Sequence, residues 1–369
     1  MNARLTVLAT DRTCNLTAFV VVDSIVEGRA MGGTRMTPGV TVDEVADLAS
    51  RMTQKLALAG VPIGGAKAGI VCDLPAGVER DRVLADFGET VAPLLHGGVY
   101  LGSDQGVSHR DRDLFFRTAG YDVLTEPRLA GLPCDWATLW HHCADVTGHG
   151  LCQAIFAAVE HGLACGPRPS VVIQGFGSVG GGVAALLDRA GWRVVAVADR
   201  HGTVSAAGGL PITELLAVTD AQGAIDRRRL PVGLCSDPAP DAWLRVPADV
   251  LVLAAGGNAI SAERADQVRA SLVVEGGNLA CAPAAQLVLA RRGITVLPDF
   301  VVNVGGAAVT GMLLTGQAPV SAGTEELVDW LYAEVGARIR RNVNAMLLRC
   351  GEGATPAQAA AELVPVAVA

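Results

Sequence analysis

Two lysines are candidates for acid–base chemistry because the chain contains no others. Of its 29 basic residues, 27 are arginines, and Lys55 and Lys67 lie twelve positions apart. An arginine stays protonated in proteins, whereas a buried lysine can release its proton near neutral pH. Apolar residues surround Lys55, and Gly64-Gly65-Ala66 precedes Lys67, which are poor surroundings for solvated side chains. The pattern favours a functional role for both lysines over a chance occurrence of two surface lysines.

A glycine-rich segment predicts a dinucleotide site. Gly175-Phe176-Gly177-Ser178-Val179-Gly180 directly follows a strand-like apolar run and opens a helical one. The first glycine permits a tight turn, the second lets a pyrophosphate approach the backbone, and the third lets the helix pack closely on the strand. The helix N-terminus then offers N–H groups to the phosphates. Glycine-rich turns are common, so the flanking strand and helix carry this prediction.

An acid at the end of the next predicted strand indicates which dinucleotide binds. Asp199 lies 24 positions after Gly175, close to the spacing of about 20 expected for the carboxylate that binds a ribose 2′-hydroxyl. A carboxylate there repels a 2′-phosphate, so we predict NAD rather than NADP. Arg200 follows directly and opposes that preference, because its positive charge attracts a phosphate.

Small residues and asparagines follow three further predicted strands. They are Ala254-Ala255-Gly256-Gly257-Asn258, Glu275-Gly276-Gly277-Asn278 and Asn303-Val304-Gly305-Gly306. Ligands of open parallel sheets bind at the carboxyl ends of the strands. We therefore expect these segments to line a nicotinamide crevice.

The first third of the chain predicts the elements that position the two lysines. Apolar runs over residues 16–31 predict strands, and residues 79–96 predict a helix. A helical period runs from an N-cap at Thr41, with Glu44 completing a capping box, to Gly60. Lys55 would then lie in the last turns of this helix. Lys67 is expected in a glycine-rich turn, and Asp104 at the end of a strand over residues 97–104.

The second half alternates between strand and helix patterns. Strands are predicted over 171–174, 193–199, 249–254, 271–275 and 294–298, with helices near 179–190 and 282–291. Such alternation implies right-handed crossovers and a parallel sheet covered on both faces. We predict an α/β protein of two domains separated by a cleft. Residues 1–135 form the substrate and catalytic domain, joined by the segment 324–369 with its long helix over 324–349, and residues 145–320 form a doubly wound Rossmann domain.

Composition excludes several classes of protein. The 369 residues suit two domains, and a chain that is half apolar and 18% charged is not disordered. A net charge of −8 argues against nucleic-acid and anionic-membrane partners. The aromatic residues are few and unclustered in sequence, so we expect no stacking platform for nucleic acid.

Cysteine usage and the N-terminus favour a cytoplasmic protein. Nine cysteines without a C-x-x-C pair suggest free thiols in a reducing compartment. Residues 1–20 include Asp11, Arg12 and Asn15 and lack a signal-peptide core, and no apolar run of about 20 residues predicts a membrane helix. His141-His142-Cys143, Asp145 and His149 match no standard zinc spacing, so no metal site is predicted.

Seven segments, in order along nearly the whole chain, resemble the glutamate/leucine/phenylalanine/valine dehydrogenases, which oxidatively deaminate L-amino acids. The set is far more specific than any one member. The segments are MGGTRM (31–36), MTQKLALAGVPIGGAKAGI (52–70), GSDQG (102–106), DVTGHG (145–150), GFGSVG (175–180), EGGN (275–278) and PDFVVNVGGA (298–307).

The resemblance implies a role for each matching residue. Lys55 would bind the substrate α-carboxylate, Lys67 would be the general base, and Asp104 would exchange protons with the substrate nitrogen. The cofactor would be NAD, the other ligands an amino acid, its 2-oxo acid and ammonia, and the assembly a homo-oligomer. The substrate pocket would include Met31, Gly32 and Gly33, and the cofactor contacts Thr147, Asn278 and Asn303.

The resemblance also bears on which amino acid is used. Members acting on glutamate hold its side-chain carboxylate with a lysine and a serine, where this chain has Met31 and Thr310. Without that lysine a buried carboxylate lacks its counter-charge, a loss of several kcal/mol, so glutamate is disfavoured. Gly102 and Ala307 resemble the phenylalanine-type pattern, and their small size predicts a bulky apolar or aromatic substrate.

Two other hypotheses remain open at this point. The same fold and cofactor would also serve an unusual amine or 2-oxo acid in a specialised biosynthetic pathway. A hypothesis of another class is a catalytically weakened sensor or partner subunit that binds NAD or an amino acid. The presence of Lys55, Lys67 and Asp104 in fitting contexts disfavours the weakened subunit.

Overall fold

The computed structural model describes residues 5–11, 16–164, 166, 168–350 and 354–365, which form two compact units. The first unit comprises the described residues of Met1–Trp136, Ala307–Leu327 and Val364–Ala369. The second comprises those of Ala137–Gly306 and Val328–Leu363. Cys14, Cys165, Arg12 and Asn15 lie outside the described residues, and the other seven cysteines are free thiols.

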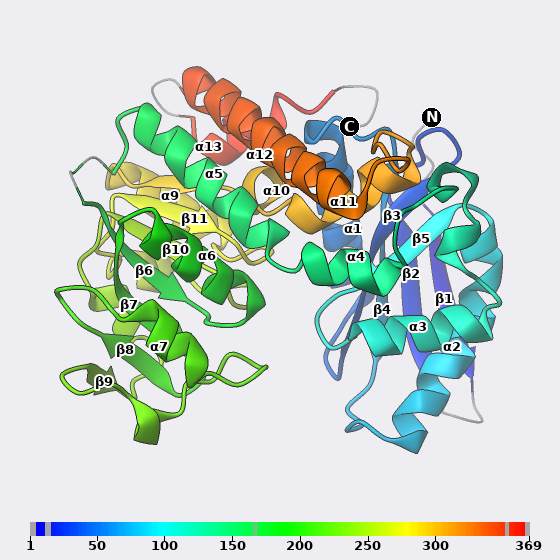
Figure 1. Ribbon diagram of the computed structural model, residues 1–369, viewed down its shortest axis with the longest axis horizontal. Coiled ribbons are helices and arrows are strands. Elements are labelled where there is room, and N and C mark those ends of the chain that lie inside the picture. Colours follow the sequence, from blue (N-terminus) through cyan, green and yellow to red (C-terminus); the bar gives the residue numbers. More distant parts are fainter. Residues whose placement is uncertain (1–4, 12–15, 165, 167, 351–353, 366–369) are drawn as a thin grey trace. The chain divides into compact units, whose positions relative to one another are not determined.

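A five-stranded sheet frames the first unit (Figure 1). Its strand order is β1-β2-β4-β3-β5; β2 pairs antiparallel with β1 and β4, and β3 pairs parallel with β4 and β5. Lys67 lies inside β4 rather than in the predicted glycine-rich turn, because Gly64 and Gly65 already pair with β3 as buried strand residues. The strands are β1 (Leu5–Asp11), β2 (Leu16–Val22), β3 (Ala30–Thr37), β4 (Gly64–Val71) and β5 (Val99–Ser103).

Helix α1 (Val42–Leu58) begins at the predicted N-cap. The Thr41 hydroxyl accepts a hydrogen bond from the Glu44 N–H at 3.2 Å, and Lys55 lies in the last turn. The predicted capping box is incomplete, because the Glu44 carboxylate accepts from Arg35 Nη1 at 2.5 Å instead. The following helices are α2 (Val78–His96), α3 (His109–Thr118) and α4 (Trp136–His142).

Aromatic side chains gather in the core of the first unit, although they are scattered in sequence. Phe115 contacts Phe87 and Phe116 edge-on, and Phe116 contacts Tyr100 and Tyr121, with ring centroids 5.0–5.7 Å apart. Helices α2 and α3 and strand β5 bring these distant positions together. All five side chains are buried, so they form core rather than an exposed platform.

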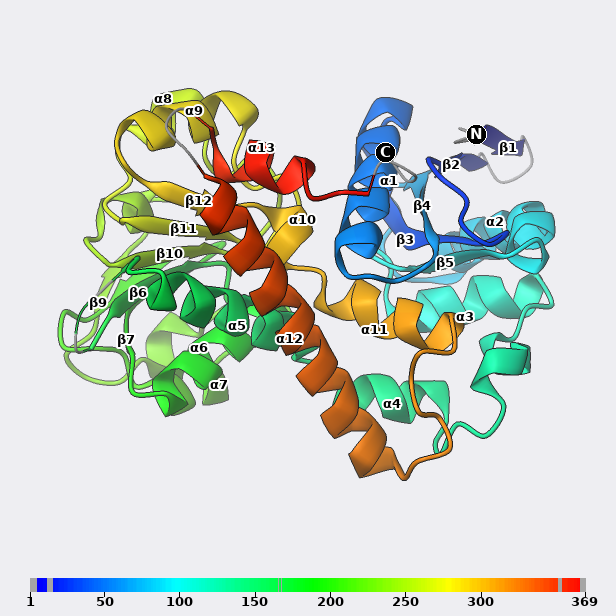
Figure 2. The ribbon, with the colours of Figure 1, turned by 90° about the horizontal axis from the view of Figure 1, so that it is seen from above.

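A seven-stranded sheet frames the second unit, in the order β12-β11-β10-β6-β7-β8-β9. The strands from β12 to β7 are parallel, as predicted, and β8 and β9 extend the sheet antiparallel. Figure 2 shows α8 and α9 near the β12 end of this sheet and α6 and α7 near its β7 end. The strands are β6 (Ser170–Gln174), β7 (Arg193–Asp199), β8 (Gly202–Ser205), β9 (Cys235–Asp237), β10 (Val250–Leu253), β11 (Leu272–Glu275) and β12 (Thr295–Leu297).

The long C-terminal helix groups mainly with the second unit, from Val328 on, whereas the sequence predicted that it joins the first. Its buried face packs on α5 at Gly150, where a β-carbon would lie 2.6 Å from Ile339 Cδ1. Residues 307–327, in contrast, belong to the first unit, because Gly311 approaches Val61 and Leu56 closely. The helices are α5 (Val146–Glu160), α6 (Ser178–Arg189), α7 (Ile212–Ala217), α8 (Ala262–Ala265), α9 (Pro283–Arg291), α10 (Asp299–Val302), α11 (Gly305–Leu314), α12 (Thr324–Arg349) and α13 (Pro356–Ala361).

Across the part of the chain that the structure describes, no helix has both the length and the apolar character needed to cross a membrane.

Candidate functional site

Helix α1 and strand β4 carry the two lysines, and glycines let these elements pack closely. A β-carbon at Gly65 would lie 2.2 Å from the Thr53 nitrogen, so only glycine allows α1 to lie this near β4. The Thr53 hydroxyl adds a hydrogen bond to Asp23 at 2.7 Å. Lys55 and Lys67 are both buried, with 5% and 4% of their surface exposed. The prediction that neither lysine is a solvated surface residue is therefore confirmed.

Lys67 and Asp104 form an ion pair across a strand that separates them. Lys67 lies on β4 and Asp104 directly follows β5, while β3 runs between these strands. Two strand spacings amount to about 9.6 Å, which a lysine side chain can cross only over a small residue. Gly33 of β3 is that residue, and Lys67 Nζ lies 2.7 Å from Asp104 Oδ2. A β-carbon at Gly33 would lie 3.2 Å from this Nζ.

Arg35 is a second cation beside Asp104 that sequence reasoning missed. Its Nε lies 3.4 Å from Asp104 Oδ2, and its Nη1 donates to Glu44. Burial raises the pKa of Asp104, but the charges of Lys67 and Arg35 outweigh burial and lower this pKa to about 2. Arg35 stands two positions after Gly33 on the same face of β3, a period-2 signal that could have identified it.

The predicted substrate-pocket residues lie on three elements of the first unit. Met31 is buried on β3, and its sulfur lies 3.5 Å from where a β-carbon of Gly311 on α11 would be. Thr310 is buried on the same helix, which also carries Ala307. Gly32 serves strand packing, because a β-carbon there would lie 1.6 Å from the Ala66 carbonyl oxygen.

The space beside Gly102 is occupied by another side chain of the same strand. A β-carbon at Gly102 would lie 3.2 Å from Tyr100 Cε1 and 3.6 Å from the Gly32 carbonyl oxygen. The small size of Gly102 had predicted that a larger substrate would fill this space. In the structure, the missing methyl group accommodates the ring of Tyr100 instead.

Glycines shape the turn between β6 and α6 in the second unit. Gly175 has φ of +93°, and a β-carbon there would lie 2.7 Å from the Ala255 nitrogen. A β-carbon at Gly180 would lie 1.9 Å from the Gly175 carbonyl oxygen, so this glycine permits close packing. Nothing lies within 4 Å of a β-carbon at Gly177, which is the N-cap of α6 and has no side-chain capping bond.

The remaining residues of this turn belong either to the core or to the first turn of α6. Phe176 is 2% exposed and packs inward, while Ser178 and Val179 form the first turn of α6. The first N–H groups of α6 have no intrahelical acceptor, as at every helix start, and such groups can donate to an anion such as a pyrophosphate.

Two asparagines predicted to meet the nicotinamide lie together at the ends of the parallel strands. Asn303 Nδ2 donates to Asn278 Oδ1 at 3.2 Å and to the Gly276 carbonyl at 3.0 Å. Among the described residues, Asn303 Oδ1 is buried and has no hydrogen-bond partner. The carboxamide N–H of a nicotinamide ring would supply the donor that this oxygen lacks, so Asn278 and Asn303 fit a nicotinamide cofactor.

Thr147 and the Ala254-Ala255 pair are also at this edge. The Thr147 hydroxyl accepts a hydrogen bond from the Gly306 N–H at 3.3 Å, at the start of α11. Ala254 follows β10, and its N–H donates to the Gln174 carbonyl at 2.6 Å.

Asp199, predicted to bind the ribose, already has a charged partner. It forms a bidentate ion pair with Arg227, and its side chain is 2% exposed. Burial opposes ionisation of Asp199, but the hydrogen bonds from Arg227 and from backbone N–H groups outweigh it and lower the pKa. Arg200 is exposed and lies 3.3 Å from Asp220. Arg227 was not predicted as the partner of Asp199 because it lies 28 residues further along the chain.

A buried acid pair supports the loop that carries Asn278. Glu275 accepts hydrogen bonds from the Cys281 and Asp299 N–H groups, and Asp299 accepts from the Leu279 N–H. Burial, together with the charge of Asp299, raises the pKa of Glu275 to about 7. These carboxylates therefore fix the backbone around Asn278.

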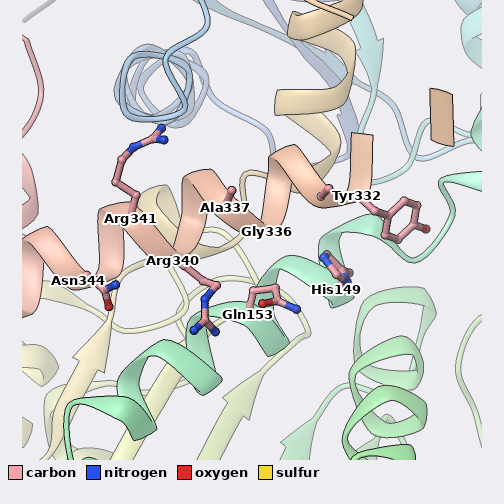
Figure 3. A pocket seen from close by; sticks show the side chains of 9 residues that line it. His149, Gln153, Tyr332, Gly336, Ala337, Arg340, Arg341 and Asn344 are labelled. Carbon is pink, nitrogen blue, oxygen red and sulfur yellow. The ribbon is translucent and has the colours of Figure 1, made fainter. Parts of the chain in front are cut away.

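A separate hollow of about 660 Å³ lies between α5 and α12 in the second unit (Figure 3). His149, Tyr332 and Arg340 help to line it, and neither lysine does. His149 belongs to the His/Cys/Asp cluster weighed as a metal site. Within the described ranges, no three His, Cys, Asp or Glu side chains are arranged to hold a metal ion.

Two family profiles together match most of the chain. The profile of the glutamate/leucine/phenylalanine/valine dehydrogenases matches residues 140–367, and the profile of the family's dimerisation domain matches residues 2–117. Glutamate dehydrogenase B of Halobacterium salinarum is 32% identical over 297 residues, which are 77% of this chain. The match spans 66% of that enzyme's length, so the chain covers about two thirds of this curated relative.

Solved structures show the same two-unit fold. The hetero-hexameric glutamate dehydrogenase of Thermus thermophilus, in a leucine-bound form, superposes with a TM-score of 0.79 at 29% identity. The alignment covers 98% of this chain and 87% of that one. L-tryptophan dehydrogenase of Nostoc punctiforme, at 21% identity and a TM-score of 0.65 over 98% and 94% of the two chains, shares the fold.

Proposed function

Because the chain belongs to the glutamate/leucine/phenylalanine/valine dehydrogenase family, we propose that it reversibly oxidises an L-amino acid to its 2-oxo acid and ammonia. A nicotinamide dinucleotide, when bound, accepts a hydride from the substrate α-carbon. The observation that carries this proposal is the ion pair between buried Lys67 and half-buried Asp104 at 2.7 Å, a base and an acid held as one unit.

Lys67 and Asp104 divide the proton transfers of the proposed reaction. Loss of the hydride leaves an iminium group, to which water adds with release of a proton. Lys67, as the general base, takes that proton at Nζ. Asp104 is ionised over the working pH range, because its pKa is about 2. It therefore donates to the departing nitrogen only after receiving a proton from Lys67, so the pair acts as a relay.

Lys55 is proposed to hold the substrate α-carboxylate. It lies in the last turn of α1, which packs on the strand of Lys67 through Gly65. A buried ammonium group pairs well with a carboxylate, since each supplies the counter-charge that the other needs. This fixes the substrate relative to Lys67.

The cofactor is proposed to be NAD, held by the turn from Gly175 to Gly180 at its pyrophosphate. Support comes from the open space where a β-carbon of Gly177 would lie and from the unpartnered oxygen of Asn303. Asn278, Thr147, Ala254 and Ala255 are proposed to complete the nicotinamide side of this site.

A bulky apolar or aromatic amino acid is the proposed substrate class. The buried Met31 occupies the position at which glutamate-specific relatives carry a lysine, and no third lysine exists in this chain. Glutamate is the second candidate, because the named relatives from Halobacterium and Thermus are glutamate dehydrogenases.

The test is NADH formation with NAD and a panel of L-amino acids at alkaline pH, followed by absorbance. Turnover of phenylalanine, tryptophan or methionine but not glutamate would support both the reaction and the Met31 argument. Turnover of glutamate alone would keep the reaction and overturn the pocket argument. Absence of turnover with every amino acid, while NADH still binds, would favour the specialised amine or the sensor.

Self-association is proposed for the first unit. β1 is an edge strand of its sheet and exposes Leu5 and Leu8, 44% and 62% of whose surfaces are accessible. Unpaired edges with apolar side chains invite pairing with another chain, and the matching family profile describes residues 2–117 as a dimerisation domain. Light scattering of wild type and Leu8→Glu tests this, since the variant should have a lower molar mass.

A further inference from the structure

The carboxylate of Asp199 has no remaining capacity to accept a hydrogen bond. Its Oδ1 accepts from the His201 N–H at 2.8 Å and from Arg227 Nη2 at 2.7 Å. Its Oδ2 accepts from the Ile225 N–H at 2.7 Å and from Arg227 Nη1 at 2.6 Å. A carboxylate offers about four acceptor positions, so a ribose hydroxyl could bind here only by displacing one of these donors.

Arg227 is held in place by more than Asp199. Its Nη1 also donates to the Ile225 carbonyl at 3.0 Å, and its Nη2 to the Gly202 carbonyl at 3.1 Å. The guanidinium group thus links the end of β7, the start of β8 and the segment after α7. A guanidinium group that donates to four acceptor oxygens is held rigidly, and its positive charge neutralises the charge of Asp199.

The segment that carries Arg227 lies against the dinucleotide turn. A β-carbon at Gly223 would lie 2.6 Å from the Gly177 nitrogen, and Gly223 has φ of +83°. The segment 219–227 is therefore anchored at the pyrophosphate turn by Gly223 and at the end of β7 by Arg227. The Asp199–Arg227 pair lies where the second strand of a Rossmann sheet meets the adenosine ribose.

We infer that the Asp199–Arg227 pair removes the negative charge on which rejection of a 2′-phosphate depends, so that this chain accepts NADP as well as NAD. The inference rests on the proposed function, since it concerns the same cofactor site. Two further charged groups near the end of β7, Arg200 and Asp220, pair with each other at 3.3 Å. A 2′-phosphate therefore meets no uncompensated carboxylate.

Binding of the two reduced cofactors tests the inference without depending on turnover. Titration of the full chain with NADH and NADPH, followed by their fluorescence, gives the ratio of the two Kd values. We expect wild type to bind NADPH within about tenfold of NADH. Arg227→Met frees the carboxylate and should weaken NADPH relative to NADH by about tenfold or more. Asp199→Asn should shift the ratio in the opposite direction, because it leaves Arg227 unpaired.

Arg228→Met is the matched control. Arg228 lies on the same segment and pairs with Asp226, but it is 89% exposed, so removing its charge should leave the ratio unchanged. Arg227→Lys keeps the positive charge but cannot form the bidentate hydrogen bonds to Asp199. If Arg227→Met does not fold, the NADPH-to-NADH ratio of Arg227→Lys tests the pair instead.

Two results would overturn the inference. One is wild type binding NADPH about a thousandfold or more weaker than NADH, since Asp199 would then act as an unpaired carboxylate. The other is an equal change of the ratio in Arg227→Met and Arg228→Met. If neither dinucleotide binds, the cofactor site itself fails and the inference with it. The expected ratios without oxidation of any amino acid would uphold the inference and refute only the proposed reaction.

Discussion

Replacing Gly33 by alanine tests whether turnover depends on the space over Gly33, through which the Lys67 side chain reaches Asp104. The new β-carbon would lie 2.9 Å from Asp104 Cβ, 2.9 Å from the Ser103 carbonyl oxygen and 3.2 Å from Lys67 Nζ. Comfortable contacts need about 3.5–4.0 Å. The Ser103 carbonyl belongs to the backbone of β5, so the two charged side chains have to give way by about 0.5 Å or more.

The expected loss is large in rate and moderate in stability. Overpacking of this kind lowers the free energy of unfolding by about 1–3 kcal/mol. Misplacing a reacting group by about 1 Å costs about a hundredfold in rate. We therefore expect the kcat of Gly33→Ala to fall by about that factor, while NADH binding stays unchanged because the dinucleotide turn belongs to the second unit.

The assay is NADH formation with the amino acid that wild type oxidises best, together with NADH binding and a urea unfolding curve. Gly39→Ala is the control, since nothing lies within 4 Å of a β-carbon at this position after β3. It should retain the wild-type rate. A folded Gly33→Ala protein with the kcat of wild type would refute the argument that this ion pair needs the space above Gly33.

Three further substitutions test other parts of the structure. Lys67→Ala should abolish turnover and leave NADH binding nearly unchanged; full activity would refute the role of Lys67 as base. Asp104→Asn should lower the free energy of unfolding by about 2 kcal/mol at neutral pH, because Lys67 and Arg35 overcome burial and lower the pKa of Asp104 from 3.8 to about 2. That difference should shrink as the pH falls from about 4 to about 2, where wild type gains the proton, and urea unfolding at several pH values measures it. Gly180→Ala places a carbon 1.9 Å from the Gly175 carbonyl and should weaken NADH binding and lower stability by about 3 kcal/mol, whereas Gly208→Ala, with open space around it, should not.

Local features of this protein could be predicted from the sequence because short-range chemistry determines them. The N-cap at Thr41, the turn from Gly175 to Gly180 and the strands around it follow from residue types a few positions apart. Lys55 and Lys67 could be identified because the chain contains no other lysines. Arginine supplies its positive charge everywhere else, so a lysine in apolar surroundings indicates a role that arginine cannot fill.

The partners of the charged groups were decided only by the tertiary structure. Strand order in the first sheet differs from chain order, so β3 lies between Lys67 and Asp104. The two side chains can meet only because Gly33 of β3 has no side chain in the space between them. Arg227 meets Asp199 through a segment that returns to the end of β7 after 28 residues. A sequence pattern specifies which residues share a local face. Which distant charges meet depends on strand pairing and loop closure across the whole chain, which no local spacing encodes.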